Sequence, residues 1–323
     1  MNPKPRHFDL IGSLALAASI VCWSLMPVML KSFKPYISGW ESNAIRYPFA
    51  ALVWSGPLFY LWKKGQVKKE VWTWALFPTL INVIAQGLWA WLPYFLDASI
   101  IGFMVRISVL FSISGGLLVF ADERPMMKSP LFWLGAALCI VGFVIMNGVG
   151  GELASGVTPT GVFLVLTCGM FYGLYGVSVR YSMRGIRPWV AFPVISIYTS
   201  IFLVALMWIF EPDSGVLLFA AEQTGPFLMV LLSAVIGIAM AHTFFYLSLE
   251  RLGSAISGGT QLVGAFFVAL WAYLWFGEKM TWVQWRGGIV LLLGGTLLLS
   301  AQTRIHPKSM DPHEVPIEPR VPD

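Results

Sequence analysis

The chain has little charge. Only 11% of its 323 residues are Asp, Glu, Lys or Arg, whereas about a quarter is usual for a soluble protein. Hydrophobic residues make up 57% of the chain, and apolar runs of about 20 residues recur from one end to the other. The sequence therefore predicts a polytopic helical membrane protein. The net charge of +5 is then a matter of membrane topology, and no nucleic-acid partner is expected.

Cysteine is also scarce. Cys22, Cys139 and Cys168 all lie inside apolar runs and have no paired spacing, so we interpret them as buried free thiols. No disulfide framework, metal site or cofactor is expected. Lys4 and Arg6 precede an apolar run as they would in a signal peptide, but no small-residue cleavage site follows them. The first run is therefore interpreted as an uncleaved membrane span.

The apolar runs predict an all-α membrane protein with ten transmembrane helices. Lys-Pro, Arg-Pro, Gly-Gly and Lys-Lys-Gly sequences mark many of the joints between them. The predicted spans are residues 10–30, 39–62, 72–95, 98–121, 130–149, 160–180, 188–210, 226–249, 254–277 and 282–301. The last segment, 302–323, holds five prolines and should be a disordered cytoplasmic tail.

The basic residues predict the orientation. With a cytoplasmic N-terminus, fifteen basic residues fall on the cytoplasmic side and three on the other, which is a strong positive-inside bias. The cytoplasmic set is Lys4, Arg6, Lys63, Lys64, Lys68, Lys69, Arg124, Lys128, Arg180, Arg184, Arg187, Arg251, Arg304, Lys308 and Arg320, against Lys31, Lys34 and Lys279. Both termini should be cytoplasmic, in a multi-pass protein of the plasma (inner) membrane.

The sequence of Ala98–Glu123 is echoed by Gly253–Glu278. The matched positions are Ser99/Ser254, Ile101/Ile256, Phe111/Phe266 and Glu123/Glu278, followed by Trp133/Trp285, Gly135/Gly287 and Gly142/Gly294. The order of these matches predicts a duplication, with residues 1–149 and 157–301 as two five-helix repeats. An odd number of spans per repeat places the second repeat upside down, and inverted repeats commonly form a substrate site where they meet.

These features resemble the EamA repeat of the drug/metabolite transporter superfamily. The resemblance rests on Trp23 in the first span, Arg46 in the second, a small-residue fourth span ending in Glu, and the Trp-x-Gly opening of the fifth. It implies a secondary transporter or facilitator of small organic metabolites, with export favoured over uptake. The fourth and ninth spans lack the proline that relatives often have there, and Arg106 replaces a small or apolar residue.

Arginine in a bilayer costs at least ~2.5–3.5 kcal/mol, so both intramembrane arginines need a reason. Arg106 should lie about 12 Å from the outer surface and is matched by Gln261 in the second repeat. We interpret Arg106 as a cavity-lining residue, with a packing clamp as the alternative. Arg46 is left open between a substrate-binding residue and a structural clamp paired with Glu41.

Other polar and aromatic side chains could join the site. Asn82 and Gln86 share one face of the third span with Trp89, because they are one helical turn apart. They could line the cavity or hold helices together. The remaining candidates for substrate binding are Trp23, its counterpart Tyr172, and His242, which is the one imidazole within the predicted spans. Packing is the alternative for each of the three.

No Asp or Glu falls in the middle of a predicted span. A site with arginine and no carboxylate favours a substrate that bears a carboxylate, such as an amino-acid-like metabolite. The prediction is a transporter that works by alternating access, is not an enzyme, and binds a small organic metabolite within a lipid bilayer. A homodimer is left open. The alternatives are a membrane-embedded enzyme, for which no acid–base pair is evident, and a receptor or structural membrane protein.

Overall fold

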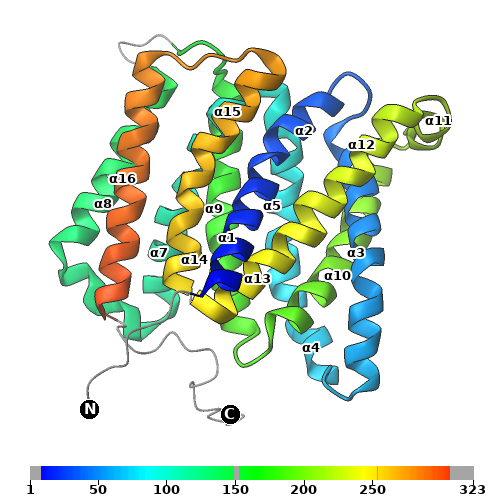
Figure 1. Ribbon diagram of the computed structural model, residues 1–323, viewed down its shortest axis with the longest axis horizontal. Coiled ribbons are helices and arrows are strands. Elements are labelled where there is room, and N and C mark those ends of the chain that lie inside the picture. Colours follow the sequence, from blue (N-terminus) through cyan, green and yellow to red (C-terminus); the bar gives the residue numbers. More distant parts are fainter. Residues whose placement is uncertain (1–8, 149–152, 253, 306–323) are drawn as a thin grey trace.

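The computed structural model describes residues 9–148, 153–252 and 254–305, and within these ranges all regular secondary structure is helical (Figure 1). The first half comprises α1 (Leu10–Ser24), α2 (Met26–Phe33), α3 (Gly39–Lys63), α4 (Lys69–Trp74), α5 (Leu76–Phe95), α6 (Ala98–Met104), η1 (Val105–Ile107), α7 (Ser108–Val119), η2 (Ala121–Lys128) and α8 (Pro130–Asn147). The second half comprises α9 (Pro159–Ser182), α10 (Pro188–Phe210), α11 (Val216–Glu222), α12 (Thr224–Ala234), η3 (Val235–Met240), α13 (Ala241–Leu252), α14 (Ser254–Thr260), η4 (Gln261–Val263), α15 (Gly264–Phe276) and α16 (Trp282–Ile305).

Several of these elements join end to end into longer rods. In the described part of the chain, nine rods are long and apolar enough to cross a membrane. They coincide with nine of the ten predicted spans. The second predicted span is α3, which has 25 residues and is not among the nine. Thus α3 is long enough to cross but less apolar than the others, and the count of ten is not confirmed.

Local sequence explains where the helices begin. Ser38 and Glu41 form a capping box at the start of α3, because each side chain accepts a hydrogen bond from the other residue's backbone N–H. Helices α8, α9 and α10 each begin with a proline, whose missing N–H costs nothing in the first turn of a helix.

The two halves pack against each other reciprocally. Helix α1 lies on α13 while α9 lies on α5, and α8 lies beside α16 at one edge of the bundle (Figure 1). On α8 and α16 the matched glycines face each other crosswise. A Cβ on Gly142 would come within 2.6 Å of the Gly287 carbonyl oxygen, and one on Gly294 within 2.7 Å of the Gly135 carbonyl oxygen. The two helices therefore run antiparallel, as an inverted repeat requires. The close approach confirms that these glycines serve packing.

The fourth spans of the two halves are also antiparallel. Ser99 near the start of α6 contacts Glu278 just beyond α15, Gly102 faces Val268, and Arg106 reaches Gly264. Helix α1 begins and α16 ends at the same end of the bundle (Figure 1). Helix α16 continues to Ile305, four residues into the segment predicted as a disordered tail; the rest of that tail lies outside the described residues.

Candidate functional site

Arg46 on α3 is 2% exposed. Its Nε donates a hydrogen bond of 2.9 Å to the Ser233 hydroxyl, and one Nη lies 3.6 Å from the Met26 sulfur. The other Nη has no hydrogen-bond partner among the described residues. The predicted alternative partner, Glu41, is instead held in the capping box and bonded to the Ser214 hydroxyl. That pairing was wrong, because Glu41 lies at the very start of α3, more than a helical turn from Arg46.

The third span supplies polar neighbours for this arginine. The Tyr172 phenol of α9 lies beside the Gln86 amide of α5 and within electrostatic range of Arg46. The Tyr172 ring meets Trp89 edge-on, with 5.9 Å between ring centroids. The Asn82 amide, one turn before Gln86, donates to the Thr199 hydroxyl of α10 at 3.0 Å. Asn82 thus joins two helices, whereas Gln86 places a polar group beside Tyr172.

Trp23 on α1 lies against the matching third span of the second half. Its indole N–H donates to the Gly237 carbonyl at 3.1 Å, within the wide turn η3. Its ring meets His242 edge-on at 5.1 Å, and His242 stacks on Phe192 at 4.0 Å. A π-helical turn such as η3 exposes a carbonyl that an α-helix would keep bonded, and such turns are frequent at functional sites.

The structure therefore confirms that Trp23 and Tyr172 occupy corresponding places. Trp23 packs on the third span of the second half, and Tyr172 packs on the third span of the first half. Met26 connects Arg46 with the surroundings of Trp23. Its sulfur contacts Arg46, and its side chain packs on Gly237, to which Trp23 is bonded.

Arg106 and Gln261 lie in matching 3-10 turns. Each turn interrupts a fourth span, η1 between α6 and α7 and η4 between α14 and α15. The Gln261 amide donates to the Ser19 hydroxyl of α1 at 2.8 Å. Arg106 lies against Gly264, and its buried Nε has no hydrogen-bond partner in the described part of the chain. Arg106 thus reaches across to the opposite half at Gly264, three residues beyond Gln261, which is itself bonded to α1.

The predicted site residues thus form two groups. Arg46, Gln86, Tyr172, Trp23 and His242 are linked, whereas Arg106 and Gln261 lie near Ser19, one helical turn from Trp23 on α1, and Asn82 is bonded to Thr199. Sequence reasoning missed Met26, Ser233 and Phe192, which contact Arg46 or His242. Serine, methionine and phenylalanine are common in membrane helices, so no sequence signal marks these three.

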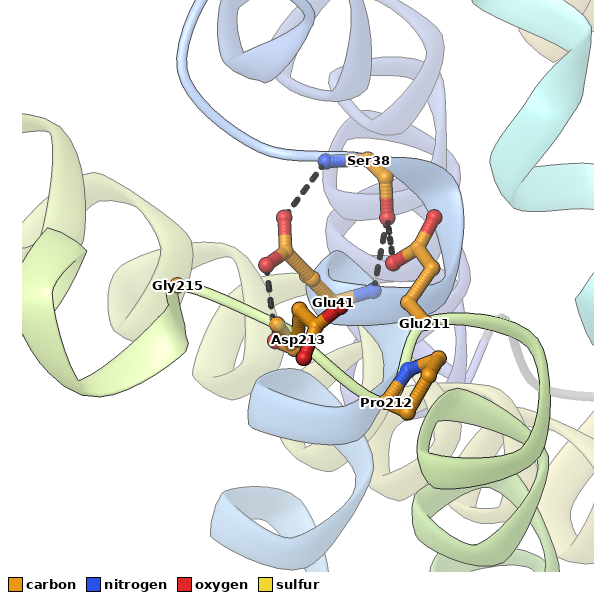
Figure 2. Close-up of a pocket in the computed structure, with 7 residues that line it drawn as sticks. Ser38, Glu41, Glu211, Pro212, Asp213 and Gly215 are labelled. Atoms are coloured by element: carbon orange, nitrogen blue, oxygen red, sulfur yellow. Dashed lines mark hydrogen bonds between the residues drawn. The ribbon is translucent and has the colours of Figure 1, made fainter.

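A separate pocket of about 340 Å³ lies at the end of the bundle where α3 begins. Figure 2 shows its lining, which includes the carboxylates of Glu41, Glu211 and Asp213. Glu41 accepts from the Ser38 backbone and the Ser214 hydroxyl, and Glu211 accepts from the Ser38 hydroxyl. These two acidic groups are occupied in holding the α3 cap to the loop after α10.

Comparison with known families agrees with this duplicated architecture. The model of the EamA-like transporter family matches residues 10–148 and again residues 159–301. The chain belongs to the EamA-like transporter family. Members of this family are membrane transporters rather than enzymes.

The EamA assignment rests on the family match, and the fold agrees with it. One solved crystal structure has a TM-score of 0.58 with this chain at 13% identity, and the match covers 91% of this chain and 98% of the other. That likeness concerns the fold alone. No curated protein gives a significant sequence match. Each EamA match covers one half of the bundle, so Arg46 and Arg106 lie in the first repeat, whereas Tyr172, His242 and Gln261 lie in the second.

In the described part of this EamA protein, arginine lies deep within the helices whereas carboxylates do not. Each Asp and Glu in the described residues lies in a loop or within three residues of the end of a helix. Neither Arg46 nor Arg106 forms an ion pair with a described residue. A guanidinium buried without a counter-charge is costly, and a negatively charged ligand would remove that cost.

Proposed function

We propose that this chain is a secondary transporter or facilitator of small organic metabolites that bear a carboxylate or a similar anionic group. The observation that carries the proposal is Arg46, a buried arginine with one free Nη and no acidic partner among the described residues. A carboxylate can accept two parallel N–H bonds from one guanidinium. The Tyr172 phenol, within electrostatic range of Arg46, and the Gln86 amide beside that phenol supply hydrogen bonds for the rest of a polar substrate.

The proposed architecture has ten spans, with α3 as the second. At about 1.5 Å per residue its 25 residues reach about 37 Å, which is enough to cross a bilayer. Its polar residues are buried inside the bundle: Asn43 bonds to the Gln86 carbonyl and Arg46 to Ser233. A polar face turned toward other helices explains how a less apolar helix can still span.

Alternating access is the proposed mechanism. Two five-helix repeats of opposite orientation can rock against each other around a site between them. The positive-inside bias supports a protein of the plasma membrane with both termini in the cytoplasm and the start of α3 outside. Export is the proposed direction, by the resemblance to exporters of this superfamily.

We assign different roles in substrate binding to Arg46 and Arg106. Arg46 is the primary ligand for the anionic group, because the Ser233 hydroxyl contacts it and the Tyr172 phenol lies within electrostatic range of it. Arg106 touches the opposite repeat at Gly264, beside the 3-10 turn that carries Gln261. We assign Arg106 to a second position on the substrate path, where it attracts the anion and is screened by it in turn.

The test is transport by the purified protein in proteoliposomes, with a pooled panel of carboxylate metabolites followed by mass spectrometry. Arg46→Gln and Arg106→Gln should each reduce uptake by at least about tenfold, the effect of losing one charge-assisted hydrogen bond. Arg286→Gln, at an exposed arginine on α16, is the matched control and should transport normally. Normal transport by Arg46→Gln would contradict the proposed site, and transport of cationic or neutral metabolites alone would contradict the substrate class.

A further inference from the structure

One ion pair joins the two repeats at the end of the bundle where α2 ends, uppermost in Figure 1. The Lys31 ammonium lies 2.7 Å from the Glu278 carboxylate and 2.6 Å from that of Asp97. Glu278 also accepts hydrogen bonds from the backbone N–H groups of Ala98 (3.1 Å) and Ser99 (2.8 Å) and from the Ser99 hydroxyl (2.7 Å). This set of contacts is called the α2-end latch.

Burial alone would raise the pKa of Glu278, but the bonds from Lys31 and Ser99 outweigh it and leave the pKa below its ordinary value. The Glu278 carboxylate is therefore charged at neutral pH, and the latch is ionic under physiological conditions.

A second ion pair joins the repeats at the other end, where α16 ends. Arg180 at the end of α9 pairs with the buried carboxylate of Glu123, and its guanidinium lies 3.6 Å from Asp122. Gln302 of α16 also donates to Glu123 at 3.4 Å. The Arg180 guanidinium covers the Phe120 ring at 4.0 Å. This set is called the α16-end latch.

The two latches correspond under the internal repeat. Lys31 and Arg180 are 149 positions apart, the same separation as Trp23 and Tyr172, and Glu123 matches Glu278. In both latches a basic residue at the end of the first span of one repeat binds the glutamate that follows the fourth span of the other repeat. The two latches lie about 33 Å apart, because the 22 residues of Ala98–Val119 between them rise about 1.5 Å each.

The contacts between the repeats differ in kind along the bundle. At α8 and α16 backbone meets backbone across glycines, as described above, and parting this seam would lose the close packing that the glycines allow. The latches are ionic and lie at the ends, where water can take over the charges when they part. Both are closed in this structure.

We infer that the α2-end and α16-end latches are the two gates of the transporter and open in alternation about the α8–α16 seam. The inference rests on the proposed alternating-access function and adds which residues hold each end shut. Rocking two repeats around a fixed seam separates one end while it compresses the other. Two symmetry-related ionic contacts provide that reciprocity, because breaking one leaves the other intact.

The test is a distance measurement by double electron–electron resonance on the full-length protein in lipid nanodiscs. One spin-label pair, at Tyr36→Cys and Trp282→Cys, spans the repeats at the α2 end. A second, at Met127→Cys and Arg187→Cys, spans them at the α16 end. All four side chains are exposed, and the three native cysteines are buried.

Lys31→Gln and Glu278→Gln should raise the long-distance population at the α2 end by about fivefold, the factor expected when one modest ionic contact is lost, and leave the α16 end closed. Glu123→Gln and Arg180→Gln should do the reverse. The controls are Lys34→Gln and Arg184→Gln, exposed basic residues near each latch, which should leave both distances unchanged. Lys31→Arg keeps the charge and should keep the α2 end closed.

Two results would overturn the inference: no change at either end in any of the four neutralised variants, or widening at both ends together. Two variants are named for each latch so that misfolding of one, seen by size-exclusion chromatography, leaves the other to decide. The proposed function is judged separately. If the two ends open in alternation but the protein moves no carboxylate, the inference about the gates stands and the proposed substrate class is refuted. Transport of a carboxylate by a protein whose two end distances do not change in the latch variants would support the substrate class and refute the gates.

Discussion

At the scale of single residues, an unsatisfied buried group on Arg46 supports the proposed binding role. Its Nε is bonded to Ser233, but one Nη is buried with no partner among the described residues. An unmet buried donor costs about 1–3 kcal/mol, and an anionic ligand bound to this Nη would remove that cost. Asn82 illustrates the opposite case, because its amide meets the Thr199 hydroxyl between α5 and α10.

This contrast gives a prediction on stability. Arg46→Met removes a buried charge while keeping the length of the side chain, so the melting temperature in detergent should stay the same or rise. Asn82→Leu leaves Thr199 unpaired in the interior and should destabilise the fold by about 1–3 kcal/mol. Thermal unfolding followed by intrinsic fluorescence measures both. A large fall in melting temperature for Arg46→Met would make Arg46 the structural clamp that the sequence left open.

At the scale of elements, the 3-10 turns η1 and η4 interrupt two helices in which proline, the usual cause of such an interruption, is absent. The fourth and ninth spans have no proline, yet both are interrupted at matching places, at Arg106 and at Gln261. The repeat pattern predicted that these two residues correspond. It could not predict the turns, because no residue in either stretch forbids a continuous α-helix and the interruption depends on packing between the repeats.

The glycine seam makes a second prediction at this scale. A methyl group at Gly142 would meet the backbone of Leu291 and Gly287 on α16, where no flexible side chain can move aside. Gly142→Ala should therefore destabilise the protein by about 1–3 kcal/mol. Gly56→Ala is the matched control, since it too lies within a helix but has no atom within 4 Å of the added methyl group. It should leave stability unchanged or raise it slightly. Equal melting temperatures for the two variants would show that α8 and α16 do not pack this closely.

At the scale of the whole molecule, the sequence predicted the class of fold and much of its internal symmetry. Apolar runs predicted the spans, and the echo of Ala98–Glu123 predicted two repeats whose corresponding helices run antiparallel. The partners of individual charges were not predictable. In the sequence, Glu123 and Glu278 are each followed directly by a basic residue, Arg124 and Lys279. The structure instead pairs them with Arg180 and Lys31 of the opposite repeat, and only Glu278 also binds backbone groups. Such pairs join residues 57 and 247 positions apart, so they depend on how the halves dock.

The energy source of transport is also a property of the whole molecule. Proton antiport needs a group that takes up and releases a proton while it faces each side in turn. Among the described residues no carboxylate lies deep in a span, and arginine stays protonated at any relevant pH. That leaves His242, whose Nδ1 is 2.8 Å from the Ile238 carbonyl and whose ring lies between Phe192 and Trp23. None of the acidic side chains in the described ranges contacts this ring to stabilise a charged imidazole.

We therefore expect transport that follows the substrate gradient without proton coupling. Proteoliposomes incubated in a solution of the carboxylate found in the panel assay, with an imposed pH gradient of two units, would measure this. The internal concentration should approach the external one and not exceed it, and His242→Ala should leave that end point unchanged even if it slows the rate. Accumulation above the external concentration that disappears in His242→Ala would establish proton coupling through this residue. Accumulation that survives the substitution would mean that another group carries the coupling ion, because a closed cycle without a coupled ion cannot move substrate uphill.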